Sequence, residues 1–442
     1  MTRLFGTDGV RGVANVDLTP DLALAVGRAA AQRLAPEGGS IVIGRDTRLS
    51  GPMLEAALMA GICSAGVDAQ VAGIVPTAAV AFLTVDEKAD AGAMVSASHN
   101  PVPDNGIKFF SAAGKKVDAS VEDEIEALME RPSALPSGAG IGTSEQLTGG
   151  VDRYVDHLLA ALETPLRGLR VVLDCAYGAA YHVAPRTFRE AGTDVIAINA
   201  EPDGGRINVD CGSTSLAGVA DRVVREGADL GLAFDGDADR VLAVDERGEI
   251  VDGDRILGLA ALALKEHAAL EGDLVVTTVM ANLGFRRALE ERGIEVLTVP
   301  VGDRHVAEAM AERGATIGGE QSGHMIFGDH STTGDGVLTG LKIAEAVAVS
   351  AGPLSDLAFF YEPYPQVMVN VKVPRPGDLK TAVEVWDEVA AAEGMLGHTG
   401  RVLVRASGTE PLVRVMVEAE DEAAARRTAE GLASVVERVL GR

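Results

Sequence analysis

The chain has 442 residues, of which 47% are hydrophobic and only 4% are aromatic. It is too long for one hydrophobic core, so we expect about three or four domains packed mainly from Ala, Val, Leu and Ile. The 39 basic and 65 acidic residues give a net charge of −26, which disfavours nucleic acid and anionic membranes as partners. An anionic ligand therefore needs a local group of basic residues or a metal ion.

Cysteine usage and the chain start bear on the cellular compartment. Cys63, Cys175 and Cys211 are far apart and form no C-x-x-C pattern, which fits a reducing cytoplasm. The first residues, M-T-R-L-F-G-T-D-G-V-R-G, contain no apolar signal core. The sequence has no run of about twenty apolar residues, so we predict a cytoplasmic protein without a membrane span.

One pattern of elements recurs three times along the chain. An apolar strand is followed by a helix that ends at a glycine, and a second strand follows that glycine. The first strands are at 40–44, 170–174 and 273–276, and the glycines are Gly66, Gly192 and Gly293. This order predicts parallel β-α-β units in which each glycine forms a left-handed helix cap.

Each copy then continues through another helix into a further apolar strand. These strands, at 91–95, 230–234 and 316–318, lead into polar loops at 96–101, 235–240 and 319–324. Loops at the carboxyl ends of parallel strands are where such folds bind ligands. We therefore expect three similar domains, each directing one loop at a shared cleft. The alternative is a chance resemblance among common β-α-β patterns.

The predicted fold class is α/β, with three similar β-α-β domains that have mixed sheets around a central cleft and a small C-terminal α+β domain. The Pro-, Gly- and Ser-rich stretch 131–148 is predicted to be a linker. Apolar and polar residues alternate from Val367 to Val373, which is typical of an antiparallel strand. The expected domains are 1–150, 151–254, 255–365 and 366–442.

Ser98 lies in the first loop, S-A-S-H-N-P, directly after a predicted buried strand. One interpretation is ordinary turn chemistry, which the tetrapeptide S-H-N-P alone favours. The other is a hydroxyl that carries a group during catalysis. The rest of the chain has to decide between them.

The second loop, D-G-D-A-D-R, places Asp235, Asp237 and Asp239 two residues apart. Carboxylates with this spacing can converge on one hard cation. An EF-hand calcium loop does not fit, because Arg240 takes the position of the turn glycine and the flanks resemble strands. Solvated turn acids are another alternative, but three carboxylates between apolar strands repel one another. We therefore expect Mg²⁺, with open positions for a phosphate oxygen that Arg240 also contacts.

Two further loops carry groups suited to a sugar phosphate. The loop G-E-Q-S-G-H contains Glu320, Ser322 and His324, although a plain Gly-rich turn is an equally good reading of this short motif. The loop R-A-S-G-T-E-P, at 405–411, combines a basic residue, two hydroxyls and a glycine, which suits a phosphate nest. A hairpin turn is the alternative there, and Arg414 is expected to add positive charge.

Two N-terminal segments stay ambiguous. The segment F-G-T-D-G-V-R-G is either a frayed tail or, through Arg11, a functional element. The segment G-R-D-T-R, at 44–48, is either a capped helix start or a basic contact. Neither segment alone decides between its alternatives.

Taken together, the motifs resemble the α-D-phosphohexomutase superfamily. The match covers the whole chain, in the superfamily's order, through S-A-S-H-N-P, N-G-I-K at 105–108, D-G-D-A-D-R, G-E-Q-S-G-H and R-A-S-G-T-E-P. The segment F-G-T-D-G-V-R-G, Gln321 and Gly408 are most similar to the bacterial branch that acts on glucosamine phosphates. Branches that act on mannose or glucose phosphates usually differ at these places.

The resemblance implies the chemistry of the first two loops. Ser98 would be a phosphoserine that donates and receives the phosphoryl group. Asp235, Asp237 and Asp239 would hold Mg²⁺, with the Ser98 phosphate as a further ligand.

It also implies roles for other residues. Lys108, Arg11 and His324 are candidates for moving the proton of the attacking hydroxyl, and His99 would orient the phosphoserine loop. The expected substrate-binding residues are Arg240, Glu320, Ser322, Arg405, Ser407, Gly408, Thr409 and Arg414.

The implied reaction interconverts glucosamine 6-phosphate and glucosamine 1-phosphate through a 1,6-bisphosphate that turns over without leaving. Its product would supply UDP-N-acetylglucosamine and cell-wall synthesis. The expected partner is this small amino-sugar phosphate, and a homodimer is left open.

Three rival functions remain at this point. One is a phosphatase that forms an aspartyl phosphate on Asp235 or Asp237. The second is a non-catalytic, metal-binding sensor of sugar phosphates. The third is a mutase that prefers glucose or mannose phosphates. The sequence also leaves open how Ser98 is first phosphorylated and which base takes the proton.

Overall fold

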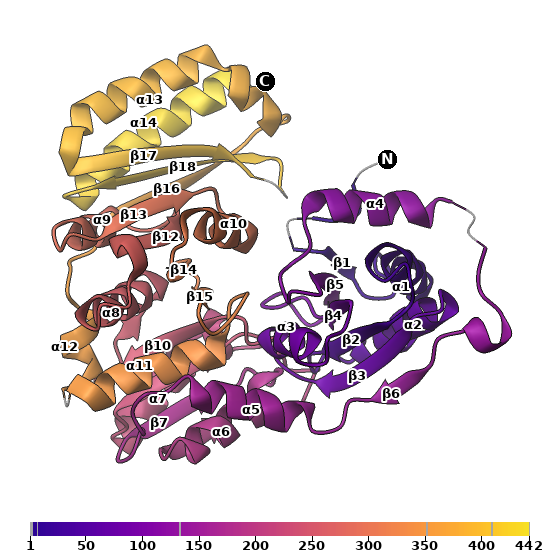
Figure 1. Ribbon diagram of the computed structural model, residues 1–442. Coiled ribbons are helices and arrows are strands. Elements are labelled where there is room, and N and C mark those ends of the chain that lie inside the picture. The colour runs from indigo at the N-terminus through magenta and orange to yellow at the C-terminus, as the bar shows by residue number, and fades with distance from the viewer. Residues whose placement is uncertain (1–2, 7, 132–133, 351, 408–409, 442) are drawn as a thin grey trace. The chain divides into compact units, whose positions relative to one another are not determined.

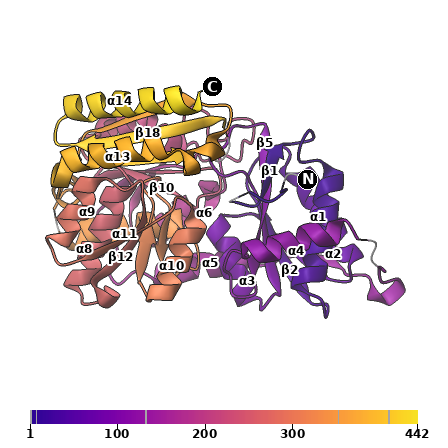
Figure 2. The ribbon, with the colours of Figure 1, turned by 90° about the horizontal axis from the view of Figure 1, so that it is seen from above.

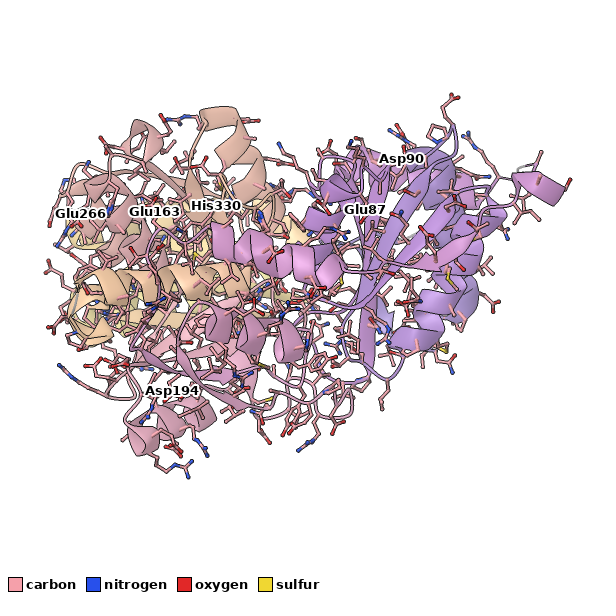
Figure 3. All side chains as sticks on the ribbon, turned by 60° about the horizontal axis from the view of Figure 1, so that its bottom comes forward. Glu87, Asp90, Glu163, Asp194, Glu266 and His330 are labelled. Atoms are coloured by element: carbon pink, nitrogen blue, oxygen red, sulfur yellow. The ribbon has the colours of Figure 1, made fainter. Side chains whose placement is uncertain are left out.

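The computed structural model describes residues 3–6, 8–131, 134–350, 352–407 and 410–441. The chain divides into two compact units, each described by itself below. Unit 1 consists of Met1–Thr278 and Leu297–Phe359, and unit 2 of Val279–Val296 and Phe360–Arg442. Exposed acidic side chains such as Glu163, Asp194 and Glu266 contribute to the negative surface (Figure 3). Among the described residues, no helix combines the length and apolar character that a membrane span requires.

The first sheet is built from the N-terminal part of unit 1 (Figure 1). Its strand order is β1-β5-β4-β2-β3-β6. The strands are β1 (Val10–Val13), β2 (Ser40–Arg45), β3 (Asp68–Ile74), β4 (Ala91–Val95), β5 (Asp104–Ser111) and β6 (Ser144–Gln146). The helices are α1 (Pro20–Leu34), α2 (Gly51–Ser64), α3 (Thr77–Asp86) and α4 (Ala119–Met129). One hydrophobic cluster joins α1, α2 and α4 to this sheet, so β4 lies in a dry interior.

The second sheet has the strand order β11-β10-β9-β7-β8. Its strands are β7 (Arg170–Asp174), β8 (Asp194–Ile198), β9 (Leu230–Phe234), β10 (Val241–Asp245) and β11 (Ile250–Val251). The helices of this part are α5 (Gly150–Ala160), α6 (Ala180–Glu190) and α7 (Ala217–Glu226). β9 is buried at every residue, so both faces of the sheet are covered there.

The third sheet has the order β13-β12-β14-β15. Its strands are β12 (Leu274–Thr278), β13 (Glu295–Val299), β14 (Ile317–Gly319) and β15 (Met325–Phe327). The helices of this part of the chain are α8 (Gly253–Glu266), α9 (Leu283–Glu290), α10 (Asp303–Arg313), α11 (Gly336–Ser350) and α12 (Leu354–Ala358). Val306 and Met310 of α10 share a small core with Val276 of β12.

The three sheets share one plan, which confirms the predicted repeat. In each, a first strand pairs in parallel with a later one: β2 with β4, β7 with β9, and β12 with β14. The later strand then pairs antiparallel with the strand after it, which makes each sheet mixed. The three polar loops therefore occupy equivalent places, at the carboxyl ends of β4, β9 and β14. The capping glycines Gly66, Gly192 and Gly293 have φ of +88°, +104° and +70°, as predicted for left-handed caps.

Unit 2 contains the small C-terminal α+β part that the sequence predicts. Its antiparallel sheet, in the order β16-β18-β17, consists of β16 (Gln366–Lys372), β17 (Gly400–Ala406) and β18 (Leu412–Ala419). Helices α13 (Val383–Leu396) and α14 (Glu422–Leu440) lie over one face of this sheet (Figures 1 and 2). Buried valines of all three strands form its core with both helices.

One prediction about an irregular segment is wrong in part, and one alternative left open by the sequence is excluded. The predicted linker 131–148 contains β6, which extends the first sheet in parallel with β3. Its three residues are all exposed, so no apolar alternation marks the strand in the sequence. The N-terminal segment is not a frayed tail, because β1 pairs antiparallel with β5 and places Arg11 opposite Gly106.

Candidate active site

Ser98 and the three aspartates meet inside unit 1. Ser98 follows β4 and the aspartates follow β9, so the parallel plan brings both loops to the carboxyl edges of neighbouring sheets. Ser98 Oγ donates a hydrogen bond of 2.6 Å to Asp235 Oδ2, and both residues are buried. The hydroxyl of a serine in an ordinary surface turn faces solvent, whereas the hydroxyl of Ser98 donates to a buried carboxylate. Turn chemistry alone therefore does not explain the position of Ser98.

The aspartate triad fits a divalent metal ion. One carboxylate oxygen from each of Asp235, Asp237 and Asp239 lies within 4.8 Å of the others. Asp237 Oδ1 and Asp239 Oδ1 are buried and accept no hydrogen bond from any described residue. Orphaned buried acceptors are costly, and oxygen ligands of this kind suit Mg²⁺. The donor set that the chain presents therefore matches the metal that the spacing predicts.

Lys108 of β5 supplies the nearest positive charge. Its Nζ lies 2.8 Å from Asp237 Oδ2 and 3.2 Å from Asp239 Oδ2. Burial alone lowers the pKa of Lys108, but these two carboxylates raise it well above its usual value. Burial raises the pKa of Asp235, and the charges of Asp239 and Asp237 raise it further. For Asp239, burial is outweighed by the Lys108 cation, which holds its pKa well below the ordinary value.

The two histidines near Ser98 differ in their environment. Burial, together with Arg240 and Arg11, lowers the pKa of His99 to about 4, so its ring is neutral at pH 7. Its Nδ1 lies 3.3 Å from Ser98 Oγ, consistent with the predicted orienting role. His324 is fully enclosed: its Nε2 accepts the amide of Gly334 at 3.1 Å, and its Nδ1 lies 3.8 Å from Asp239 Oδ1. Burial lowers the pKa of His324, but Asp239 outweighs this and raises it.

The backbone at Ser98 is in an uncommon conformation. Its φ is +52°, in the left-handed region that a serine rarely adopts, and Ala238 in the aspartate loop has a φ of +56°. The two loops also pack backbone against backbone. A Cβ on Gly236 would lie 2.5 Å from the carbonyl oxygen of Ser98, so only glycine fits there. Strained residues of this kind cluster at functional sites.

The sequence analysis missed several residues that hold these loops. Arg48 and Asp46 lie beneath the Ser98 loop, where the sequence left G-R-D-T-R ambiguous. Asn208, from the second sheet's region, donates to the carbonyl of Ser98 at 2.9 Å. Thr77 Oγ1 donates to Asp237 Oδ2 at 2.6 Å. Only Asp46 and Arg48 had a signal that was available in advance, since both follow the carboxyl end of the predicted strand 40–44.

A second charged group lies beside Lys108. Arg11 pairs with Asp8, and its Nη1 lies 3.3 Å from Asn100 Oδ1 in the Ser98 loop. Lys116 bridges Asp8 and Asp303, with 2.9 Å between its Nζ and Asp303 Oδ2. Arg11 thus lies beside the Ser98 loop, and a chain of ion pairs connects it to the first residue of α10.

The third loop presents the residues predicted to bind the sugar. Glu320 Oε1 accepts the backbone amide of Gly302 at 3.1 Å, and Ser322 Oγ donates to Glu320 Oε2 at 3.4 Å. The amide of Arg240 donates to Asp235 Oδ1 at 3.2 Å, while the Nε of its guanidinium is buried without a hydrogen-bond partner among the described residues. That Nε lies 3.8 Å from Asp239 Oδ1, so the guanidinium is placed beside the triad, where it suits a phosphate oxygen.

The predicted phosphate loop lies in the β17–β18 hairpin of unit 2. Arg405 and Arg414 are directly opposite each other on the two paired strands. Burial lowers the pKa of Arg405, and the neighbouring Arg414 lowers it further. Ser407 Oγ accepts the amide of Glu410 at 3.2 Å. Gly408 and Thr409, also predicted to bind phosphate, lie outside the described residues.

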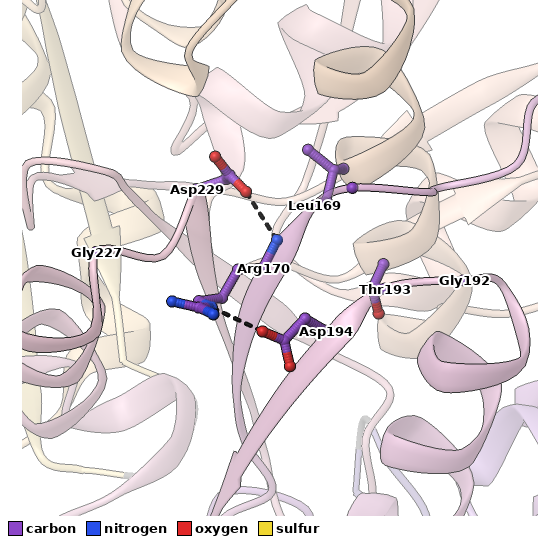
Figure 4. A pocket seen from close by; sticks show the side chains of 8 residues that line it. Leu169, Arg170, Gly192, Thr193, Asp194, Gly227 and Asp229 are labelled. Atoms are coloured by element: carbon purple, nitrogen blue, oxygen red, sulfur yellow. Dashed lines mark hydrogen bonds and ion pairs between the residues drawn. The ribbon is translucent and has the colours of Figure 1, made fainter.

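A pocket at the other ends of the strands of the second sheet carries no comparable chemistry. It is lined by residues at the amino ends of β7, β8 and β9 (Figure 4). Arg170 donates its backbone amide to Asp229 and its guanidinium to Asp194, both at 2.7 Å. Its charges are therefore paired within the chain, and the aspartate triad lies at the opposite strand ends.

Comparison with known proteins covers nearly the whole chain. Four regions match the phosphoglucomutase/phosphomannomutase domains: residues 2–135 match alpha/beta/alpha domain I, 152–248 domain II, 252–364 domain III, and 368–435 the C-terminal domain. A phosphoglucosamine mutase of Rhodococcus opacus (strain B4) is 53% identical over 442 residues, which cover 99% of each chain. One of Streptomyces avermitilis is 54% identical over 453 residues and covers all of both.

Solved structures agree with the fold. A phosphoglucomutase/phosphomannomutase family protein of Burkholderia thailandensis is 27% identical, with a TM-score of 0.83, and the match covers 99% of this chain and 98% of that one. An N-acetylphosphoglucosamine mutase of Aspergillus fumigatus, solved with GlcNAc-6P and magnesium, gives a TM-score of 0.71 over 99% and 96% of the two chains. At 19% identity, this second match bears on the fold alone.

Proposed function

The chain belongs to the phosphoglucomutase/phosphomannomutase family, and on that premise we propose that it interconverts glucosamine 6-phosphate and glucosamine 1-phosphate. The observation that carries the proposal is Ser98 Oγ held 2.6 Å from one member of a buried aspartate triad. The relatives that are more than half identical over the full chain, and are named phosphoglucosamine mutases, support the choice of amino sugar. The product would feed UDP-N-acetylglucosamine and cell-wall synthesis.

The proposed reaction has two matching halves. In the first, the C1 hydroxyl of glucosamine 6-phosphate attacks the phosphoryl group carried on Ser98. The bond from phosphorus to Ser98 Oγ breaks, a bond to the sugar oxygen forms, and the hydroxyl proton leaves to a base or solvent. The 1,6-bisphosphate then turns over, and Ser98 Oγ attacks the 6-phosphoryl group. The bond from phosphorus to the C6 oxygen breaks, that oxygen takes up a proton, and a bond from phosphorus to Ser98 Oγ forms. Glucosamine 1-phosphate is released, and the enzyme is phosphorylated as before.

Asp235, Asp237 and Asp239 would hold Mg²⁺, which when bound neutralises charge on the phosphoryl group in transfer. Arg240 supports the same charge from a guanidinium whose Nε has no hydrogen-bond partner among the described residues. Phosphoryl transfer depends mainly on positioning and electrostatics, so a strong base is not needed.

The proton therefore has several acceptable routes. Lys108, Arg11 and His324 remain our candidates for moving it. Lys108 is best suited to donate, because its pKa is raised well above the ordinary value by Asp237 and Asp239, despite its burial. His324 is less free to act, since its Nε2 already accepts the amide of Gly334. His99 orients the Ser98 hydroxyl from 3.3 Å.

Substrate binding is assigned to two loops. Glu320 and Ser322 would bind sugar hydroxyls. The non-reacting phosphate would be held by the hairpin residues Arg405, Ser407, Gly408, Thr409 and Arg414. The facing pair Arg405 and Arg414 supports this, because like charges directly opposite each other are unfavourable and a bound phosphate would relieve their repulsion. Arg414 Nη2 also lies 3.2 Å from Glu410 Oε2, so that carboxylate already balances part of the charge.

The compartment and assembly complete the proposal. We place the protein in the cytoplasm and keep the domains at 1–150, 151–254, 255–365 and 366–442. A homodimer stays a prediction, to be tested by sedimentation.

One coupled assay tests the function. The purified protein, with Mg²⁺ and a trace of hexose 1,6-bisphosphate, is compared on the 1-/6-phosphate pairs of glucosamine, mannose and glucose. We expect kcat/KM to be highest for the glucosamine pair. Preference for mannose or glucose would identify the rival mutase, and release of inorganic phosphate from an aspartyl phosphate would identify the phosphatase. Binding without turnover would identify a sensor.

A further inference from the structure

We propose that Arg48 and Asn208 are positioning residues that fix the backbone of the Ser98 loop, and that they thereby direct the phosphoserine to the sugar rather than to water. The inference rests on the proposed function, because it concerns the fate of the group on Ser98. Neither residue touches the triad or the reacting hydroxyl through any hydrogen bond in the described chain. Both act through main-chain carbonyl groups.

Arg48 gathers four carbonyl oxygens of one loop. Its Nη1 donates to Pro101 at 2.6 Å and to Asp104 at 2.9 Å. Its Nη2 donates to Ser98 at 2.9 Å and to Asn100 at 2.8 Å. Because a guanidinium is planar and rigid, the four carbonyls are fixed relative to one another. No flexible ammonium group could replace this arrangement.

The guanidinium itself is anchored from below. Arg48 is completely buried, and its Nε donates to Asp46 Oδ2 at 2.9 Å. The same oxygen accepts Ser96 Oγ at 2.7 Å, and Ser96 Oγ accepts the amide of Ser98 at 2.9 Å. The amide of Ser98 and its carbonyl are therefore both tied to one Asp46–Arg48 pair.

Asn208 holds the same loop from the other side. Its Nδ2 donates to the carbonyl of Ser98 at 2.9 Å and to that of Asn100 at 3.3 Å. These are the two carbonyls that Arg48 Nη2 already contacts. The backbone of Asn208 is anchored in turn, because its main-chain N–H donates to the carbonyl of Ala176 at 3.1 Å. The loop is thus held by two parts of the chain that belong to different sheets.

This clamp matters because of the conformation that it holds. Ser98 has a φ of +52°, a left-handed conformation that is unfavourable for serine unless surrounding contacts hold it. With its amide and carbonyl fixed, the direction of its Cβ is fixed too, and Oγ points at Asp235. A shift of about 1 Å in a reacting group can cost about 10²-fold in rate. A phosphoserine with a mobile backbone is also more accessible to water, so its hydrolysis should be faster.

The experiment compares four variants with the wild type in full-length protein. Arg48→Lys keeps the charge and loses the planar fork. Asn208→Ala removes the two donors, and Asn208→Asp turns a carboxylate oxygen toward the two carbonyls. Arg28→Lys is the matched control, because Arg28 is a partly buried arginine whose Nε donates to Ser64 Oγ, within the helices of the first sheet. Each protein is phosphorylated with glucose 1,6-bisphosphate and freed of the sugar.

Three quantities are measured: kcat and KM for glucosamine 6-phosphate, the loss of phosphate from Ser98 in buffer by intact-protein mass, and the thermal unfolding midpoint. We expect kcat to fall roughly 10²-fold for Arg48→Lys and for Asn208→Asp, with KM within about threefold. Asn208→Ala should be less affected than Asn208→Asp, because it lacks the repulsion. Phosphoserine hydrolysis should accelerate in the same order, and Arg28→Lys should match the wild type.

The outcomes are separable. Folded Asn208→Asp with wild-type kcat and wild-type phosphoserine lifetime would overturn the inference, as would a change confined to the unfolding midpoint. If Arg48→Lys does not fold, the two Asn208 variants carry the test alone. If the wild type fails to turn over glucosamine phosphates, the proposed function is wrong. The phosphoserine lifetimes would then still decide whether Arg48 and Asn208 hold the loop.

Discussion

Two charged regions of this protein are built on opposite plans. Around Ser98 the charged side chains are buried, and Lys108 pairs with both Asp237 and Asp239. In the β17–β18 hairpin, Arg405 and Arg414 face each other and are partly exposed. The first region is held by ion pairs and hydrogen bonds within the chain, whereas in the second two like charges face each other and Arg414 pairs with Glu410. We therefore expect changes near Ser98 to act on kcat and changes in the hairpin to act on KM.

Removing the Ser98 hydroxyl should abolish the chemistry of the first region and leave substrate binding by the second region intact. Ser98→Ala should lower kcat by roughly 10³-fold or more, because in the proposed reaction Ser98 carries the phosphoryl group. The Kd for glucosamine 6-phosphate, measured by calorimetry, should stay within about threefold. Ser64→Ala, which removes a hydroxyl that donates to Gly61 in α2, is the control. Surviving turnover in Ser98→Ala would rule out our assignment of the nucleophile.

Metal removal should come next in size. EDTA should lower the activity about 10²-fold, because Asp237 Oδ1 and Asp239 Oδ1 then lack their cation. Mg²⁺ at 100 times its Kd should also stabilise the folded state by about 2.7 kcal/mol. This metal-induced rise in the unfolding midpoint should vanish in Asp237→Asn and persist in the exposed Asp194→Asn. A rise of equal size in both variants would place the metal elsewhere.

Removing one of the facing arginines should separate binding from stability. Arg405→Met keeps most of the side-chain stem and should raise KM roughly 10- to 100-fold, since a charged hydrogen bond contributes about 1.5–3 kcal/mol. The midpoint of thermal unfolding should not fall, because burial and Arg414 already lower the pKa of Arg405. Inorganic phosphate should stabilise the wild type more than the variant. A lower midpoint with unchanged KM would mean that the pair is structural.

The last prediction concerns local stability alone, namely the pH dependence of the contacts that Asp46 makes beneath Ser98. Burial raises the pKa of Asp46 to about 6. The protonated Asp46 carboxyl therefore stabilises the folded state. This stabilisation is complete below the unfolded-state pKa, near 3.9, and is lost as the pH rises through about 6. The loss is about 3 kcal/mol for a shift of about two units.

The asparagine in Asp46→Asn does not titrate, so comparison with the wild type isolates the contribution of Asp46 to the pH dependence of stability. Between pH 4 and 7, its free energy of opening should gain about 2 kcal/mol relative to the wild type. Native-state hydrogen exchange at the amides of the Ser98 loop measures that difference. A constant gap across this range would show that Asp46 does not titrate as its burial implies.

The sequence predicts much of this architecture, for local reasons. The strands 170–174 and 230–234 match β7 and β9, because short apolar runs between turn residues have few other stable forms. The capping glycines were identifiable, since a left-handed residue at a helix end strongly favours glycine. The alternating aspartates also predict a metal site without knowledge of the fold.

The parts that could not be predicted depend on contacts across the chain. Arg48 meets carbonyls some fifty residues away, and Asn208 reaches Ser98 from 110 residues away. Neither contact leaves a periodic pattern in the sequence. The strand β6 was missed for a related reason, because its exposed residues are held only by backbone pairing with β3.

The central claim is that Ser98 carries the phosphoryl group between the two ends of the sugar. Protein labelled with ³²P from glucose 1,6-bisphosphate should be mixed rapidly with unlabelled glucosamine 6-phosphate and quenched over time. The account predicts label on Ser98 at the start, and its appearance in glucosamine 1,6-bisphosphate at a rate no slower than kcat. Label on an aspartate, or label that stays on Ser98 while unlabelled product accumulates, would contradict it.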